Sequence, residues 1–571
     1  MSQLLENQRL TFEQRKASMD FLRLAMKNSY IGWSLKATLI GKSGDDILDE
    51  CQSVQKLKDQ PILSFEFYDD LRACIAKFED AHLNITRLLP PPFVITGIAN
   101  TAWINSKLII TRNRPELIRK FQEVENFKNE ELVNALSIGN EILEIDDQVP
   151  SDQIKDLSKF ISSSTDDSRM AFSANLFFSR NFNFPRQSML KLKIRNQQNE
   201  DVIVQIPWVQ TINNQGGIDS ELILESKGIK KTLTFAEKEF PLIKSEGFEG
   251  SDQLIDDLKE YKSYVLSQEN EPVIRLGLQK ITNEDYRCYL QILDFDIKNT
   301  DKKIPYKIFL ENTDPKKEMT SVGMIQEVKK FLLSCEENSS ELILDLRDNG
   351  GGSTHLMTAI YAMFEDPEKN NLFVANAYPK TPGNLAFMLA SLKSLTGSES
   401  TVKDETFFQI YNQIGMNPNV TNWIVISDKK LTRKVYTKRL LVLTSPFCIS
   451  ACENLVHRLK ATRRAQIIGQ ATNGTGFGFS SNSAAETKFR DPFNLYELRM
   501  PNHAFSFLLN PDATNLSQDQ SFLVQTEKFE NIPLLENNPA IPDFDYKINE
   551  NDLFGFKSYL EFIDSVSETS N

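Results

Sequence analysis

Two stretches decide the fold: LILDLRDNGGGSTHL at residues 342–356 and LVLTSPFCISACENLVHRL at residues 441–459. Each begins with a near-continuous apolar run, which is typical of a strand that is buried on both faces. A sharp turn follows, and an amphipathic helix comes after the turn. Two strand–turn–helix units of this kind predict an α/β core.

The second turn places Ser450 at the start of its helix. A hydroxyl group there lies beside the unpaired N–H groups and the positive dipole end of the helix, where an acyl-transfer nucleophile can be supported. The glycines at 350–352 leave their backbone N–H groups unobstructed, so the amides of Gly351 and Ala451 can form an oxyanion hole. The alternative is that the glycines only end a strand and that Ser450 caps its helix, with Glu453 completing a capping box.

The rest of the chain divides into segments of different character. Residues 1–112 have apolar residues at helical spacing and predict a helical region. Residues 113–208 follow the order of turn, strand, short helix and terminal hairpin that a PDZ-like domain has. Residues 209–268 are polar and predict an insert or linker. The α/β core then occupies residues 269–550, and a tail at 551–571 ends the sequence.

Composition excludes several classes of partner. The 571 residues are 40% hydrophobic and 25% charged, which predicts a globular protein of several domains. A formal net charge of -13 gives no electrostatic reason to expect nucleic acid or anionic lipid. No apolar run approaches the roughly 18 to 20 residues that a membrane span needs. The N-terminus has no apolar signal segment, so the protein is cytoplasmic or its signal was removed before numbering.

The six cysteines are scattered along the chain. Their spacing is neither that of a disulfide scaffold nor that of metal knuckles, so we expect buried thiols. Cys448 and Cys452 flank Ser450 but have no further ligand at local metal-binding spacing, so no metal site is predicted there.

The two strand–turn–helix units resemble the paired signatures of the tail-specific, or C-terminal processing, serine proteases. The matching stretches are LILDLRDNGGG, SACE and the later IIGQATNGTGFG, and the segment order is the same over roughly residues 10 to 565. The resemblance implies a crotonase-like α/β protease core with a helical N-terminal region and an inserted PDZ-like domain. It also implies protein or peptide substrates, a homodimer, self-cleavage in the 209–268 insert, and no metal or organic cofactor. By the same analogy an exported protein is favoured.

One departure from that family concerns the base. Most members use a Ser-Lys dyad, and Thr475 stands where the lysine is expected. Lys460 lies on the same helix as Ser450, about 15 Å away at 1.5 Å per residue, which is too far for a hydrogen bond. A base other than lysine is therefore required.

The branch of the family that includes the chlamydial protease-like activity factor resembles a Ser-His-Glu arrangement instead. Its histidine lies in a D-x-H motif near the N-terminus, as in Asp80-Ala81-His82 here, and its glutamate opens a motif near the C-terminus, as in ENNPAIPDF from Glu536. The resemblance implies that Ser450 is the nucleophile, His82 the general base and Glu536 the residue that orients the histidine. Pro539-Ala540 stand where that branch has Gly-Val.

Some alternatives stay open for the base and for the third residue. His457 lies on the same helix as Ser450 but about 10 Å away, so we expect a packed or surface side chain. His503 is predicted to be a strand residue without a catalytic role, whereas His355 follows the glycines and remains a second candidate for the base or for a substrate contact. Glu527 and Glu530 compete with Glu536 but lie in a polar run.

Two other functions fit the same segments. A catalytically silent scaffold would bind peptide C-termini or edge strands through the PDZ-like domain. An esterase would use the same core on a non-peptide ester. The presence of a complete Ser450, His82 and Glu536 set favours the serine endopeptidase.

Overall fold

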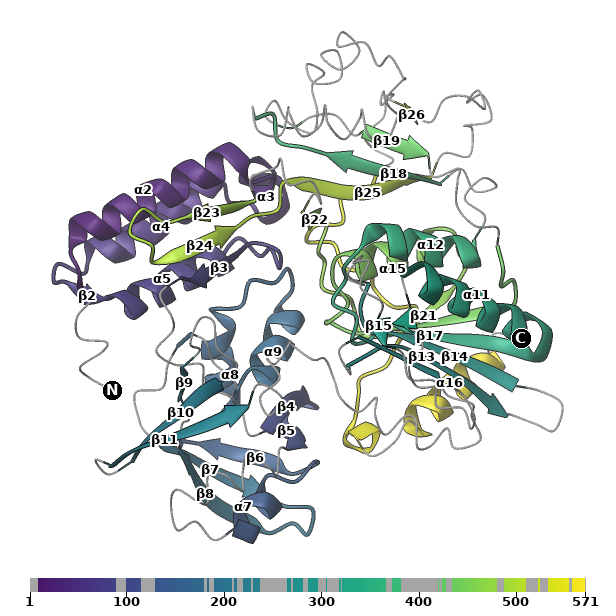
Figure 1. Ribbon diagram of the computed structural model, residues 1–571, viewed down its shortest axis with the longest axis horizontal. Helices are drawn as coiled ribbons and strands as arrows, with labels where there is room; N and C mark the ends of the chain where they lie inside the picture. The colour runs from purple at the N-terminus through teal and green to yellow at the C-terminus, as the bar shows by residue number, and fades with distance from the viewer. Residues whose placement is uncertain are drawn as a thin grey trace.

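The computed structural model describes residues 9–88, 99–113, 129–178, 182–183, 189–207, 210–212, 219–226, 229–236, 264–268, 271–280, 286–295, 304–305, 318–319, 321–365, 372–381, 420, 424–427, 434–479, 487–509, 522–523, 532–553 and 557–569. Figure 1 shows a helical region, a sheet domain below it, and an α/β core beside both. Every helix within the described ranges is too short or too polar to traverse a lipid bilayer.

Helices dominate the N-terminal region, as the spacing of apolar residues predicts. They are α2 (Phe12–Ser29), α3 (Gly32–Ile40), α4 (Gly44–Lys56) and α5 (Ser64–Ala76). Thr11 caps α2 and Ser43 caps α4, each through a capping box. The region also has two small sheets. One pairs β1 (Arg9–Leu10) with β2 (Ile62–Leu63). The other has the order β23-β24-β3 and joins β3 (Asn84–Arg87) to two strands from far along the chain, β24 (Tyr496–Arg499) and β23 (Lys488–Arg490). The helical region is therefore completed by residues of the C-terminal third of the chain.

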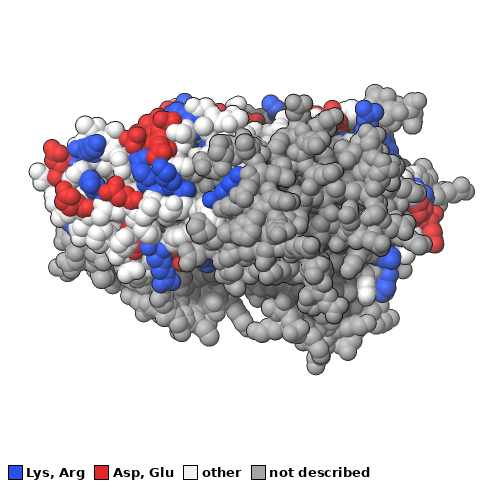
Figure 2. Space-filling model, turned by 90° about the horizontal axis from the view of Figure 1, so that it is seen from above, with Lys and Arg blue, Asp and Glu red and all other residues white. Residues whose placement is uncertain are grey.

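Charged side chains of both signs mix on the described surface of this region (Figure 2). Arg23 pairs with Asp45 and Asp49, and Glu50 pairs with Lys42 and Lys77. Exposed pairs of this kind contribute little to stability. The described part of the face in Figure 2 carries no extended patch of a single sign.

A five-stranded antiparallel sheet forms the next domain, in the order β4-β5-β6-β7-β8. Its elements are β4 (Ala99–Ile104), β5 (Lys107–Asn113), α7 (Asn129–Ala135), β6 (Glu141–Ile145), α8 (Pro150–Ser158), α9 (Asp166–Asn175), β7 (Met189–Arg195) and β8 (Asp201–Pro207). The boundary expected at residue 112 falls inside β5, because β4 and β5 form a hairpin that pairs with β6. The sheet thus begins earlier than the sequence pattern indicated, and the PDZ-like assignment stays a prediction.

The segment expected to be an insert or linker contains paired strands. They are β9 (Gln210–Ile212), β10 (Asp219–Ser226) and β11 (Ile229–Ala236), in the order β11-β10-β9. The predicted self-cleavage concerns a segment of which residues 237–263 lie outside the described ranges.

The predicted α/β core is confirmed. Its seven-stranded sheet has the order β12-β13-β14-β17-β20-β21-β27, and the strands from β14 to β27 run parallel. The strands are β12 (Tyr264–Gln268), β13 (Glu271–Lys280), β14 (Tyr286–Ile292), β17 (Ser339–Asp345), β20 (Arg439–Thr444), β21 (Gln466–Gly469) and β27 (Phe544–Asp545).

Helices cover both faces of this sheet (Figure 1). One face carries α11 (Ser321–Asn338), α12 (Thr354–Phe364) and α15 (Ala451–Ala461), and the other carries α16 (Lys557–Thr569). Because side chains alternate along a strand, Leu342 and Leu344 pack with the first set while Ile343 packs with Tyr559 and Ile563 of α16. Most of the expected tail at 551–571 is therefore a core helix.

A second, five-stranded antiparallel sheet has the order β22-β25-β18-β19-β26. Its strands are β22 (Phe477–Gly478), β25 (His503–Leu509), β18 (Leu372–Ala377), β19 (Ile424–Ser427) and β26 (Phe522–Leu523). The remaining short elements are β15 (Ile304–Pro305), β16 (Glu318–Met319) and η4 (Glu550–Leu553).

The expectation of free cysteine thiols is wrong, because the six cysteines form disulfides. Cys51 is bonded to Cys74 between α4 and α5, and Cys288 to Cys335 between β14 and α11. Cys448 is bonded to Cys452 across Ser450. The first two pairs are separated by 23 and 47 residues, so only the fold brings them together. Neither sulfur beside Ser450 is a free thiol that could bind a metal.

Candidate active site

The two predicted turns lie side by side at one edge of the core sheet. Strands β17 and β20 are parallel neighbours, with Asp345 beside Leu443 at their carboxyl ends, the edge at which open α/β sheets carry their sites. Gly351 in the first turn has a φ of +99°, and a Cβ there would lie 2.7 Å from both the Ile449 carbonyl oxygen and Ser450 Cβ. Only glycine lets the first turn contact the second so closely.

Ser450 has a strained backbone at the start of α15. Its φ of 62° and ψ of -118° lie outside the backbone regions that residues with a side chain usually adopt. A backbone conformation of this kind costs on the order of 1–3 kcal/mol. A strained strand-to-helix turn of this kind exposes a hydroxyl beside the amino end of the helix. Ser450 is partly exposed and its side chain makes no capping hydrogen bond. Ser450 is therefore the N-cap residue of α15 without the side-chain hydrogen bond that the capping-box alternative expects.

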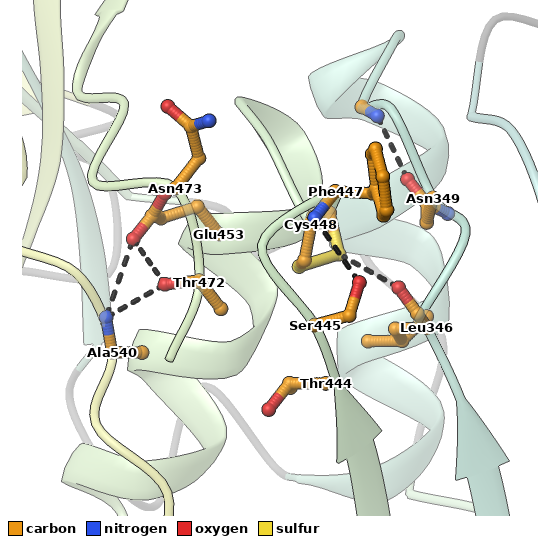
Figure 3. The surroundings of a disulfide bond; sticks show 12 residues. Leu346, Asn349, Thr444, Ser445, Phe447, Cys448, Glu453, Thr472, Asn473 and Ala540 are labelled. Atoms are coloured by element: carbon orange, nitrogen blue, oxygen red, sulfur yellow. Dashed lines mark hydrogen bonds between the residues drawn. A yellow bond between two sulfur atoms is a disulfide. The ribbon is translucent and has the colours of Figure 1, made fainter. Parts of the chain in front are cut away.

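Glu453 fastens a loop against α15 instead of completing a capping box. Its fully buried carboxylate accepts hydrogen bonds from the Gly474 amide at 2.7 Å, the Thr475 amide at 2.8 Å and the Thr472 hydroxyl at 2.5 Å. The Ala540 amide donates to the same group at 3.3 Å, and Figure 3 shows Glu453, Thr472 and Ala540 near the disulfide. The sequence showed Glu453 but not this role.

Thr475 occupies the position at which the family resemblance led us to look for a lysine. It is fully buried, its amide is bound by Glu453, and its hydroxyl donates to Asn473 Oδ1 at 2.8 Å. Because residue 475 is a buried threonine, a serine–lysine dyad with a lysine at this position is excluded.

The predicted oxyanion donors are adjacent but not both free. An ideal Cβ on Gly351 would be 3.3 Å from the Ala451 nitrogen. The Gly351 amide, however, donates to Asn349 Oδ1 at 2.8 Å, and Asn349 is held by its own hydrogen bond to the Ile292 carbonyl oxygen at 2.9 Å. Gly351 must release Asn349 before its amide can bind an oxyanion.

His82 is oriented by backbone groups and by Asp80. The His82 amide donates to Asp80 Oδ1 at 2.8 Å, and the Tyr30 hydroxyl donates to Asp80 Oδ2 at 2.8 Å. The imidazole Nδ1 lies 2.5 Å from the Phe477 carbonyl oxygen. Because a carbonyl oxygen only accepts, Nδ1 carries the proton and Nε2 of the neutral ring is left as a hydrogen-bond acceptor.

Two connections join the His82 turn to the Ser450 turn. Phe477, which holds the imidazole, directly follows the loop that Glu453 fastens to α15. Asn473 in that loop donates to Ser163 Oγ at 2.8 Å, and the neighbouring Ser162 hydroxyl donates to the Asp80 carbonyl oxygen at 2.5 Å. No described hydrogen bond joins Ser450 directly to His82.

No described hydrogen bond or ion pair joins Glu536 to His82. One carboxylate oxygen pairs with Lys36 Nζ at 2.6 Å, and the other accepts from the amides of Gly476 at 2.8 Å and Phe477 at 3.1 Å. Burial raises the pKa of Glu536, and the Lys36 ammonium opposes that shift. The expectation that Glu536 itself holds the imidazole needs correction, because the Phe477 carbonyl holds it. A backbone carbonyl has no sequence signature, so the pattern could not indicate it.

The other candidates are placed as follows. His457 Nε2 lies 3.0 Å from the Asn538 carbonyl oxygen and 3.5 Å from Glu453 Oε1. His503 is in β25, and burial together with the neighbouring His82 lowers its pKa to about 4, so it lies within electrostatic range of the proposed base. His355 belongs to α12, but its side chain lies outside the described residues, as do Glu527 and Glu530.

The ionisation of His82 predicts the acid limit of activity. Burial lowers the pKa of His82 from its ordinary 6.5, although Asp80 raises it. A general base works when neutral, so activity is present above this pKa and is lost as the pH falls through it. We expect the acid limb of kcat/KM against pH to have its midpoint below 6.5, and Asp80→Asn to move it lower still. A midpoint above pH 7, unmoved by Asp80→Asn, would contradict His82 as the controlling base.

Comparisons with known proteins agree with this architecture. Residues 288–488 match the profile of peptidase family S41, a stretch that contains Ser450 but neither His82 nor Glu536. Mature CPAF in complex with lactacystin is similar in structure, with 15% identity, a TM-score of 0.63 and coverage of 98% of each chain. A second structure of mature CPAF has 16% identity and a TM-score of 0.63, over 97% of this chain and 96% of that one. These likenesses show a shared fold. No curated protein matches the sequence.

Proposed function

The α/β core of this chain belongs to peptidase family S41, the tail-specific serine proteases, and we propose that Ser450 and His82 carry out its peptide hydrolysis. The observation that carries this proposal is the backbone conformation of Ser450 at the amino end of α15. Its φ is 62°, and its hydroxyl makes no capping hydrogen bond. Backbone strain of this kind clusters at functional sites, and at a strand-to-helix turn it exposes a nucleophile in a hydrolase.

In the proposed first step, the Ser450 hydroxyl attacks the peptide carbonyl while His82 Nε2 takes its proton. The Phe477 carbonyl keeps Nδ1 protonated, so the ring presents Nε2 in the required tautomer. The imidazolium that forms is stabilised by Asp80, whose charge raises the pKa of His82. His82 then donates the proton to the leaving amine, which leaves an acyl group on Ser450.

The charge on the carbonyl oxygen is proposed to develop toward the amides of Ala451 and Gly351. The Ala451 amide lies at the positive end of α15. Gly351 contributes once its hydrogen bond to Asn349 is exchanged for the oxyanion. Water activated by His82 then hydrolyses the acyl-enzyme by the reverse proton transfers.

Glu536 is proposed as the third residue of the site, beside Ser450 and His82. It acts through the backbone of residues 476 and 477 rather than by contact with the imidazole. It binds the amides of Gly476 and Phe477, and the Phe477 carbonyl binds His82. This relay supports a Ser-His-Glu set in which the glutamate sets the position of the histidine. Self-association as a homodimer stays a prediction of the family resemblance.

A comparison of substrates separates the proposal from its rivals. We expect purified protein to degrade casein, a loosely folded substrate, at a rate well above its rate on short p-nitrophenyl acyl esters at equal enzyme concentration. Faster ester turnover with intact casein would indicate an esterase on the same core. No turnover of either substrate, with retained binding of peptides, would indicate the silent scaffold.

A further inference from the structure

Lys36 is a fully buried cation that the proposed chemistry does not use. It lies in α3, and its side chain has 0% exposure, as does that of its ion-pair partner Glu536. Nζ donates to Glu536 Oε1 at 2.6 Å, to Asn537 Oδ1 at 2.6 Å and to the Glu79 carbonyl oxygen at 3.1 Å. An ammonium group has three hydrogens, so these contacts use all of them.

These three partners belong to two chain segments that meet at the site. Glu79 directly precedes Asp80 in the turn that carries His82, and Glu536 with Asn537 forms the loop that holds the Phe477 backbone. The Asn537 side chain also donates to the Glu79 carbonyl oxygen, at 3.4 Å. Lys36 is thus the point at which the turn that carries the base and the loop that carries the glutamate are joined.

We propose that Lys36 is a positioning residue of the peptidase site, which holds Glu536 and the His82 turn in register so that the Phe477 carbonyl meets the imidazole. This inference rests on the proposed function. The route has three steps: Lys36 fixes one carboxylate oxygen of Glu536, the other oxygen fixes the Phe477 amide, and the Phe477 carbonyl fixes Nδ1 of His82.

Stability alone is a poor reason for this arrangement. Two buried charges lose their hydration, and a buried ion pair is often no more stabilising than two apolar side chains of similar volume. What the pair supplies is direction, because three short contacts to defined atoms fix the loop and the turn relative to each other. A shift of about 1 Å in the position of a catalytic group can cost about 100-fold in rate.

A double-mutant cycle on kcat tests the inference. The variants are Lys36→Met, Glu536→Gln and the two combined, assayed on fluorescent casein after their melting curves have been recorded. We expect Lys36→Met to lower kcat by about 100-fold with KM changed little, because the effect falls on the transition state. In the Glu536→Gln background, the same substitution should change kcat by less than about threefold, since the route is already broken.

Arg15→Met is the matched control. Arg15 is also fully buried in the helical region, but its guanidinium donates to backbone carbonyls of Leu10, Lys58 and Gln60, away from the site. The Arg15→Met substitution should lower the melting temperature and leave kcat within about threefold of wild type. If Lys36→Met does not fold, the combined variant, which removes both charges, is compared with Glu536→Gln alone.

The outcomes separate this inference from the function on which it rests. Two results would overturn the role of Lys36 alone. One is an active wild type whose kcat is not changed by Lys36→Met, and the other is a combined variant in which the kcat losses of the two single variants multiply. A wild type without peptidase activity, and without reaction of Ser450 with a fluorophosphonate, would overturn the proposed function and the inference with it.

Discussion

Replacing Ser450 with alanine is expected to abolish peptidase activity, with kcat on casein falling by about 10⁶-fold. The hydroxyl is the only group that forms the acyl-enzyme in the proposed reaction, and loss of the serine in such a group removes nearly all of its rate enhancement. Fold and stability should change little, because Ser450 makes no capping hydrogen bond and alanine retains the Cβ. The measurement is casein hydrolysis by variant and wild type with matched melting curves.

Ser353→Ala is the control for that variant. Ser353 is the N-cap of the neighbouring helix α12, and its side chain also makes no capping hydrogen bond. It follows the glycines of the first turn, so it lies in the same part of the fold but is not the proposed nucleophile. A crippled Ser353→Ala enzyme beside a nearly normal Ser450→Ala enzyme would show that the nucleophile is misassigned.

His82→Ala should cost about 10⁴–10⁶-fold in kcat, because Ser450 then loses the group that accepts its proton. The combined Ser450→Ala and His82→Ala variant should be no slower than Ser450→Ala alone. Residues that act as one unit show such non-additive losses, whereas a histidine with a separate structural role would add its own. Rates are to be measured above pH 7, where the wild-type base is neutral.

His457→Ala and His503→Ala are the comparisons for His82. His457 lies on α15 with Ser450 but contacts the Asn538 carbonyl, and His503 lies within electrostatic range of His82. Both variants should keep kcat within about tenfold of wild type. A loss at His503 as large as that at His82 would mean that the base is shared or misassigned.

The strand–turn–helix units could be predicted because their signals are local. Each unit consists of a run of apolar residues, a glycine-rich or tight turn, and apolar residues at helical spacing. These signals specify the structure within about fifteen residues. In the structure, Gly351 and Ser450 lie together because β17 and β20 are parallel neighbours that end at the same edge of the sheet. The position of Ser450 on its turn was therefore accessible from residues 441–459 alone.

The arrangement around the base could not be predicted in the same way. Lys36 and Glu536 are separated by 500 positions and meet only in the fold. The group that holds His82 is a backbone carbonyl, which any residue at position 477 would supply. Glu453 was visible in S-x-x-E, but the capping interpretation used only local geometry, whereas its carboxylate binds a loop more than 18 residues away. Long-range partners decide these roles.

Two expected boundaries, near residues 112 and 551, differ from the elements of the structure for a related reason. Strands β4 and β5 form a local hairpin, and their sequences could not show that β5 also pairs with β6 across the expected boundary. Likewise, α16 is amphipathic, but only the sheet face with Ile343 and Leu441 shows that Tyr559 and Ile563 belong to the core. The disulfides depend on the same long-range packing.

The central claim is that Ser450 is a nucleophile activated by His82, and one labelling measurement tests it most directly. Wild type and His82→Ala are treated with a fluorophosphonate at pH 7.5, chosen to lie above the ordinary pKa of histidine, and the adduct is located by peptide mass spectrometry. The account predicts a single adduct on Ser450 in the wild type, formed at least about 100-fold more slowly in His82→Ala. An adduct on another residue, or equal labelling of Ser450 with and without His82, would contradict it.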